Sequence, residues 1–77
     1  MTDALRLHHL MLRAHRDQDL DALPGLYLQA ARLRESEGEI DAACFFYTQA
    51  YVYALDCGDT DNANQARLKL KAFGRDQ

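Results

Sequence analysis

Apolar positions recur with helical spacing along almost the whole chain. At 100° per residue, they gather on one side of each of four segments, which predicts an all-α fold of antiparallel helices. These helices are expected at approximately residues 3–16, 20–37, 39–57 and 60–73. The pattern predicts a single helical domain over residues 1–77, with residues 1–2 and 75–77 frayed.

The first segment carries its apolar side chains on one half of its circumference. That half contains Ala4, Leu5, Leu7, His8, Met11, Leu12, Ala14 and His15. The helix is expected to start after Thr2 or Asp3 and to stop at the polar run that begins with Arg16. It should therefore lie with this half against the core.

The second segment combines helix-starting and helix-ending signals. Asp19 or Asp21 can cap its N-terminus, Pro24 suits a first turn, and Gly38 suits a left-handed closing residue. Its expected inward arc contains Leu20, Leu23, Leu26, Tyr27, Ala30, Ala31 and Leu33, with Arg34 projecting from the same arc.

The third segment is the most hydrophobic part of the chain. Residues 42–55 read AACFFYTQAYVYAL and hold five of the seven aromatic residues. The expected core stripe is Ile40, Ala43, Cys44, Tyr47, Ala50, Tyr51 and Ala54, flanked by Phe46 and Tyr53. Phe45 and Val52 lie on the opposite side. Either a neighbouring helix covers these two, or they are exposed for a partner.

The fourth segment begins after Gly58, with Asp59 or Thr60 as its cap. Its expected inward residues are Ala63, Ala66, Leu70 and Phe73, and Leu68 lies off that face. A four-helix antiparallel array follows from the short connections.

Charge and targeting features bring in no further partner. The net charge of −3 and the scattered nine Lys and Arg residues argue against nucleic-acid binding. Acidic residues gather near helix starts and basic ones near helix ends, as helix dipoles favour. The chain shows neither a signal peptide nor an apolar run long enough for a membrane span, so we expect a cytoplasmic protein with no membrane partner. Cys44 and Cys57 are thirteen residues apart on one helix and should stay reduced.

Residues 24–55 resemble one tetratricopeptide repeat, a helix–turn–helix unit of about 34 residues. The matching positions are Tyr27, Ala31, Gly38, Ala43, Tyr47 and Ala50. Ala30, Arg34 and Leu55 depart from the family's pattern. The resemblance implies a non-catalytic module built of helical hairpins that binds other proteins. Because such arrays need three or more stacked units, pairing with a second copy would supply the missing neighbours.

Candidate chemistry is sparse. His8 and His15 share one side of the first helix but stand roughly 10 Å apart along its axis, too far for one metal ion without help. No metal site, cofactor site or catalytic motif is expected, and the chain is not expected to be an enzyme. A small-ligand or metal-binding protein using His8, His15 and Tyr51 is kept as an alternative.

The sequence favours a small protein-interaction module that forms a homodimer through helix 39–57. The partner-binding candidates are Phe45, Val52, Arg34, Tyr27 and Tyr53. Arg34 has two interpretations, an ion pair with Glu37 or an anchor for a partner's carboxylate. Tyrosines suit interfaces, but a core position is the favoured interpretation for Tyr53. A third alternative is an accessory subunit of a larger enzyme.

Overall fold

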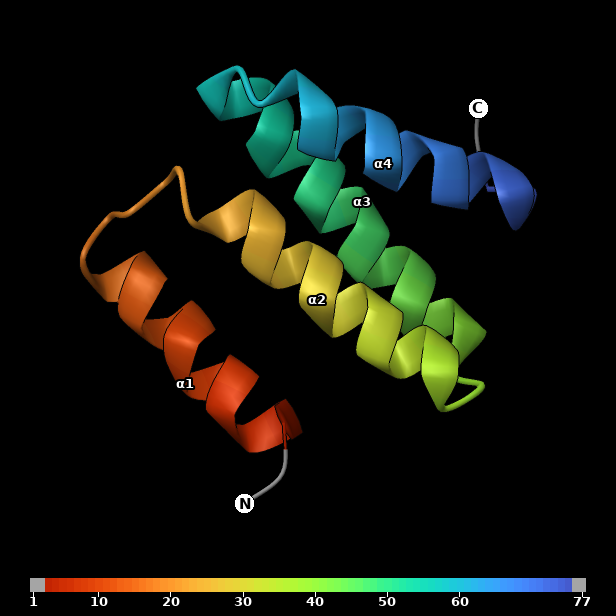
Figure 1. Ribbon diagram of the computed structural model, residues 1–77, viewed down its shortest axis with the longest axis horizontal. Coiled ribbons are helices and arrows are strands. Elements are labelled where there is room, and N and C mark those ends of the chain that lie inside the picture. The colour runs from red at the N-terminus through yellow and green to blue at the C-terminus, as the bar shows by residue number, and fades with distance from the viewer. Residues whose placement is uncertain (1–2, 76–77) are drawn as a thin grey trace.

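The computed structural model describes residues 3–75 as four α-helices joined by short turns (Figure 1). In chain order they are α1 (Asp3–Arg16), α2 (Leu23–Ser36), α3 (Ile40–Cys57) and α4 (Thr60–Ala72). Residues 3–75 contain no strand. Successive helices run in opposite directions, so the predicted all-α antiparallel array of four helices is confirmed.

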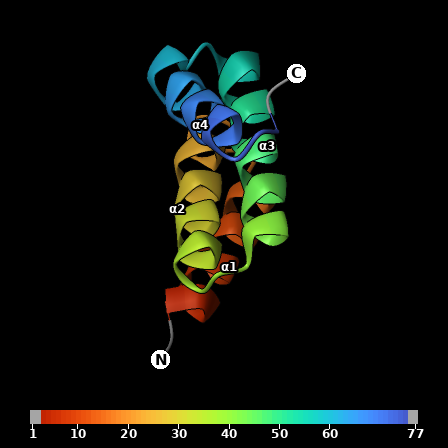
Figure 2. The ribbon, with the colours of Figure 1, turned by 90° about the vertical axis from the view of Figure 1, so that its right-hand side faces the viewer.

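The helices form a flat molecule. The extents of the Cα trace are 33 × 31 × 14 Å, and the shortest of them is about two helix layers. Seen edge-on, α2 and α4 lie on one side and α3 on the other (Figure 2). The backbone of α2 approaches all three other helices, and that of α3 approaches α2 and α4. Within residues 3–75, the backbone of α1 approaches only that of α2.

The hydrophobic core lies between α2, α3 and α4. Its buried members are Leu28, Ala31, Ala43, Cys44, Tyr47, Ala50, Ala66 and Leu70. Five of these eight are alanine or cysteine, which lets the helix backbones approach closely, while the ring of Tyr47 fills the remaining space. The core stripe predicted on α3 is confirmed, as is the inward face of α4, and Leu68 is exposed as expected.

A polar link crosses this core edge. The Tyr47 hydroxyl donates a 2.7 Å hydrogen bond to Oε1 of Glu35, and Nζ of Lys69 donates to Oε2 at 3.1 Å. The three residues come from α3, α2 and α4 respectively. The hydrogen bond from Tyr47 is the largest cause that lowers the pKa of Glu35, and Lys69 lowers it further.

The ends of three helices follow the predicted signals. Gly38 and Gly58 adopt left-handed φ angles of 78° and 75°, directly after α2 and α3. Asp59 caps α4, because its Oδ1 accepts a 3.1 Å hydrogen bond from the backbone N–H of Asn62.

The start of α2 differs from the prediction. The helix begins at Leu23 rather than residue 20, its N-cap is Ala22, and no side chain caps it. The predicted caps Asp19 and Asp21 are therefore wrong. The backbone N–H of Asp19 instead donates to the carbonyl of Ala14 at 2.8 Å and closes the end of α1.

The buried arc of α2 also differs from the prediction. Leu20 is exposed, because it lies in the turn before the helix. Leu28, which was not assigned to the core, is buried. Because α2 touches three helices, its buried arc is wider than one stripe.

Arg75, the last described residue, forms two hydrogen bonds to the rest of the chain. The backbone N–H of Arg75 donates to the carbonyl of Leu70 at 2.8 Å, and its guanidinium donates to Asp41 at 2.7 Å. The expectation that residue 75 is frayed stays a prediction. The expectations for residues 1–2 and 76–77, including a cap by Thr2, lie outside the described residues.

None of the helices within residues 3–75 has the length and hydrophobicity needed to cross a membrane.

Candidate protein-interaction surface

Aromatic side chains from three helices meet beside α2. We call His15 of α1, Tyr27 of α2, and Phe46 and Tyr53 of α3 the aromatic cluster. The rings of Tyr27 and Tyr53 stack with centroids 5.2 Å apart and planes at 25°. The His15 ring meets both tyrosine rings edge-on, with centroids 6.1 Å and 5.8 Å away. These contacts join α1 to α3 through side chains although their backbones stay apart.

A hydrogen bond also links two members of the aromatic cluster. Nε2 of His15 and the hydroxyl oxygen of Tyr27 are 3.0 Å apart. Burial raises the pKa of Tyr27 above its ordinary value, and the neighbouring Tyr53 raises it further. Tyr27 therefore keeps its proton over the whole physiological pH range.

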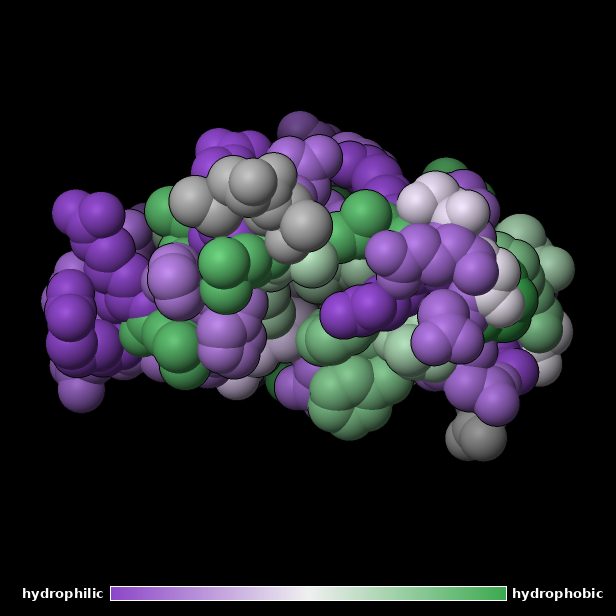
Figure 3. Space-filling model, turned by 90° about the horizontal axis from the view of Figure 1, so that it is seen from below, coloured by the Kyte–Doolittle hydropathy of each residue, from purple (hydrophilic) through white to green (hydrophobic). Residues whose placement is uncertain are grey.

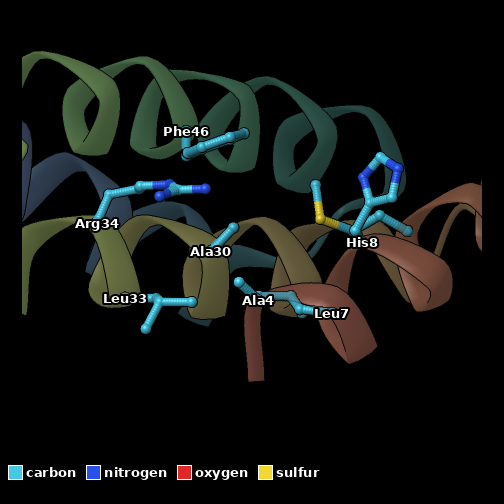
Figure 4. A pocket seen from close by; sticks show the side chains of 8 residues that line it. Ala4, Leu7, His8, Ala30, Leu33, Arg34 and Phe46 are labelled. Carbon is cyan, nitrogen blue, oxygen red and sulfur yellow. The ribbon is translucent and has the colours of Figure 1, made fainter. Parts of the chain in front are cut away.

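A small pocket between α1, α2 and α3 adjoins the aromatic cluster. It has a volume of about 120 Å³ and is lined by Ala4, Leu7, His8, Met11, Ala30, Leu33, Arg34 and Phe46. Arg34 extends from α2 toward Phe46, with His8 at the opposite end of the pocket (Figure 4). Pockets for drug-sized ligands measure roughly 300–1,000 Å³, so this one suits a single side chain rather than a cofactor.

Arg34 forms the ion pair that the sequence offered as one of its two interpretations. Its Nη1 lies 2.9 Å from Oε1 of Glu37, and both side chains are partly exposed. An ion pair this exposed contributes little stability, roughly 0–1 kcal/mol, and can be exchanged for another carboxylate. Arg34 can therefore keep its pair with Glu37 or turn to a partner.

Phe45 and Val52 form the outer stripe of α3. They are 58% and 45% exposed, so within residues 3–75 no helix covers them. The ring of Phe45 meets that of Phe46 edge-on, with ring centroids 5.5 Å apart, which joins the outer stripe to the aromatic cluster. Exposed hydrophobic side chains interrupt the polar surface of the molecule in the view from below (Figure 3).

The apolar half predicted for α1 is only partly buried. Leu7 and Ala14 are buried, but Leu5, Leu12, His8 and His15 are exposed. The expectation that these four face the core is wrong, because α1 has one backbone neighbour and a single helix covers only part of a half-circumference. The width of the apolar half, set against the number of helices able to cover it, is the signal that could have revealed this.

The two histidines do not converge on one site. His8 lines the pocket, whereas His15 lies against Tyr27 and Tyr53. No group of three or more His, Cys, Asp or Glu residues in the described part of the chain could hold a metal ion. Cys44 is buried, Cys57 is half-buried, and both are free thiols.

The structure brings two of the five partner-binding candidates, Tyr27 and Tyr53, into direct contact. Arg34 lies at the adjoining pocket, and Phe45 and Val52 lie on the outer side of α3. No family model matches the chain, and neither a curated protein nor a solved structure matches it. Function must therefore be inferred from the geometry and chemistry of this surface.

Proposed function

We propose that this protein is a small, non-catalytic protein-interaction module of the cytoplasm that forms a homodimer through the outer stripe of α3. The observation that carries the proposal is the exposure of Phe45 and Val52, 58% and 45%, seven residues apart on one helix. Large apolar side chains exposed on one side of a helix are candidates for an association site.

The aromatic cluster supports this choice of surface. Tyr27 and Tyr53 present rings with polar tips, the combination enriched where one protein binds another. Their mutual stacking and the contact with His15 hold the rings in place before binding, which lowers the entropy lost on association.

The α2–α3 hairpin is the part for which we propose a tetratricopeptide-like role. Ala31, Ala43, Tyr47 and Ala50, four of the six matching positions, are buried where these helices pack. Repeats of this kind stack on neighbours, and residues 3–75 form two helix pairs. A second copy is the simplest source of a further neighbour.

Sedimentation equilibrium over a wide concentration range tests the proposal. The natural chain should dimerise at micromolar concentration, and a variant with Phe45→Asp and Val52→Asp should remain monomeric with unchanged helical circular dichroism. Leu68→Asp is the matched control, because Leu68 is an exposed leucine on α4, away from the outer stripe. A natural chain that stays monomeric at high micromolar concentration would overturn the proposal.

A further inference from the structure

We infer that the surface receiving the outer stripe of α3 is α1 of the second copy, so that each α1 packs against the partner's α3. This rests on the proposed dimer and adds its geometry. Two observations point to α1, namely a second apolar stripe of matching spacing and a complementary pattern of charge.

The second apolar stripe is formed by Leu5 and Leu12. They are 46% and 54% exposed and seven residues apart, the same spacing as Phe45 and Val52. On a helix, residues seven apart lie on one side, about 10 Å from each other along the axis. Each protomer therefore presents two parallel apolar rows of equal length.

The two rows border the same open side of the molecule. His8 and Phe46 line one pocket, and seven residues further along each helix His15 meets Tyr53. Because α1 and α3 are both antiparallel to α2, they run in the same direction (Figure 1). At 100° per residue, Leu5 and Leu12 lie next to His8 and His15 on the circumference of α1, on the side farther from α2. On α3, Phe45 lies next to Phe46 in the opposite direction of rotation.

The shared register interleaves the two rows. The ring contact between His15 and Tyr53 sets the register of α1 against α3. Because the two helices run in the same direction with the same rise per residue, Leu12 lies between the levels of Phe45 and Val52. Consider a two-fold axis that runs parallel to the helices, between α1 and α3. It brings the α1 row of one protomer opposite the α3 row of the other, without any shift along the helix axis. Leu12 of one protomer then inserts between Phe45 and Val52 of the other, and the contact is made twice.

Charge favours this arrangement over one that pairs like helices. The last turn of α1 carries Arg13, His15 and Arg16. The last turn of α3, wholly within the described chain, carries Asp56 and no basic residue. An acid at a helix C-terminus opposes the helix dipole unless a cation is near, and the proposed register brings Arg16 of the second copy beside Asp56.

The alternative two-fold axis, perpendicular to the helices, would pair α3 with the partner's α3 in antiparallel fashion. It would set the start of α3, with Asp41 in its first turn, against the end of the other α3 with Asp56. Asp56 would then face the existing Asp41–Arg75 ion pair instead of the cationic end of α1, which is the less favourable arrangement for its charge.

The available area fits a second copy. A stable interface needs about 800 Å² from each partner. The broad side of the molecule measures 33 × 31 Å, so a dimer must use both α1 and α3 rather than the outer stripe alone.

Cross-linking with introduced cysteines tests the geometry. Cys57→Ser removes the half-buried thiol, and Cys44 is buried in the core. In this background we expect Leu12→Cys and Val52→Cys proteins to form a disulfide-linked dimer when mixed and oxidised, and neither to do so efficiently alone. Efficient cross-linking of Val52→Cys with itself overturns the inference. So does the absence of any efficient cross-link in a protein that sedimentation shows to be a dimer, and in both cases the proposed dimer still stands. A natural chain that is monomeric overturns the proposed function itself.

A charge exchange gives an independent readout. Asp56→Arg should weaken the dimer by about tenfold, because two exposed pairs become repulsive, and adding Arg16→Asp should restore most of the affinity. Asp61→Arg and Arg67→Asp, exposed charges on α4, are the matched controls and should leave the dissociation constant unchanged. Failure of Arg16→Asp to rescue Asp56→Arg overturns the pairing of α1 with α3.

Discussion

The hydroxyl of Tyr47, a residue only 1% exposed, donates its hydrogen bond to Glu35, whose other carboxylate oxygen accepts from Lys69. One carboxylate thereby ties three helices together at the edge of the core. Because a buried hydroxyl without a partner is costly, this pair fixes how α3 lies against α2.

Tyr47→Phe keeps the ring and removes this hydrogen bond. We expect the free energy of unfolding to fall by about 1 kcal/mol, measured by urea denaturation at a concentration where the chain is monomeric. Tyr51→Phe, on the same helix and half-buried, is the control and should change stability less. Equal effects would show that the Glu35 pair contributes nothing specific.

Stability should fall in acid because of Glu35. Its pKa is lowered in the folded state from the ordinary 4.5, first by Tyr47 and then by Lys69. A lowered folded pKa stabilises the protein above the unfolded value, and that contribution is lost as pH falls through the folded pKa. The difference in unfolding free energy between the natural chain and Glu35→Gln should therefore be largest above the ordinary pKa of 4.5 and shrink as the pH falls below it. A difference independent of pH would contradict the assignment.

The outer stripe should not contribute to the stability of a single protomer. Phe45→Asp and Val52→Asp are expected to change the unfolding free energy of the monomer by no more than about 0.5 kcal/mol each, because both sites are largely solvent-exposed. Urea denaturation at low protein concentration measures this. A loss of several kcal/mol would mean that the stripe is covered within the protomer.

The first helix should open before the others. Its backbone approaches only α2 within the described chain, and two of its residues, Leu7 and Ala14, are buried. We expect amide hydrogens of α1 to exchange faster than those of α3 in native-state hydrogen exchange. Tyr27→Ala should increase the exchange of α1 further, since it removes the partner of His15. Equal protection of α1 and α3 would contradict this order.

Two glycines should respond to alanine with opposite signs. Gly58 has a φ of 75°, so Gly58→Ala should cost about 1 kcal/mol through backbone strain. Gly25 lies inside α2, and a Cβ there would meet nothing within 4 Å. Gly25→Ala should therefore stabilise the protein by about 0.5 kcal/mol. Thermal or urea unfolding of both variants gives the comparison.

Helical periodicity was sufficient to predict α3, α4 and their core stripes, because small residues such as Ala43 and Ala50 alternate with Tyr47 at regular spacing. The ends of helices at Gly38 and Gly58 followed from the left-handed conformation that only glycine adopts easily. These signals are local, so a single sequence contains them.

Features set by the number of neighbours could not be predicted in the same way. The periodicity of α1 shows which half is apolar, but the exposure of Leu5 and Leu12 depends on how few helices pack there. The aromatic cluster likewise joins His15 to Tyr53, residues far apart in the sequence. Asp19 was misread as a cap because its backbone closes α1 instead.

The thickness of 14 Å has a consequence for how the protein can change over evolution. In a plate two helices thick, every helix keeps one flank toward water, so no substitution inside the chain can enclose α3 completely. Apolar residues gained on that flank add adhesiveness rather than core. Substitutions at the exposed Phe45 and Val52 can therefore change the surface of α3 while the opposite flank, built on Tyr47, maintains the fold.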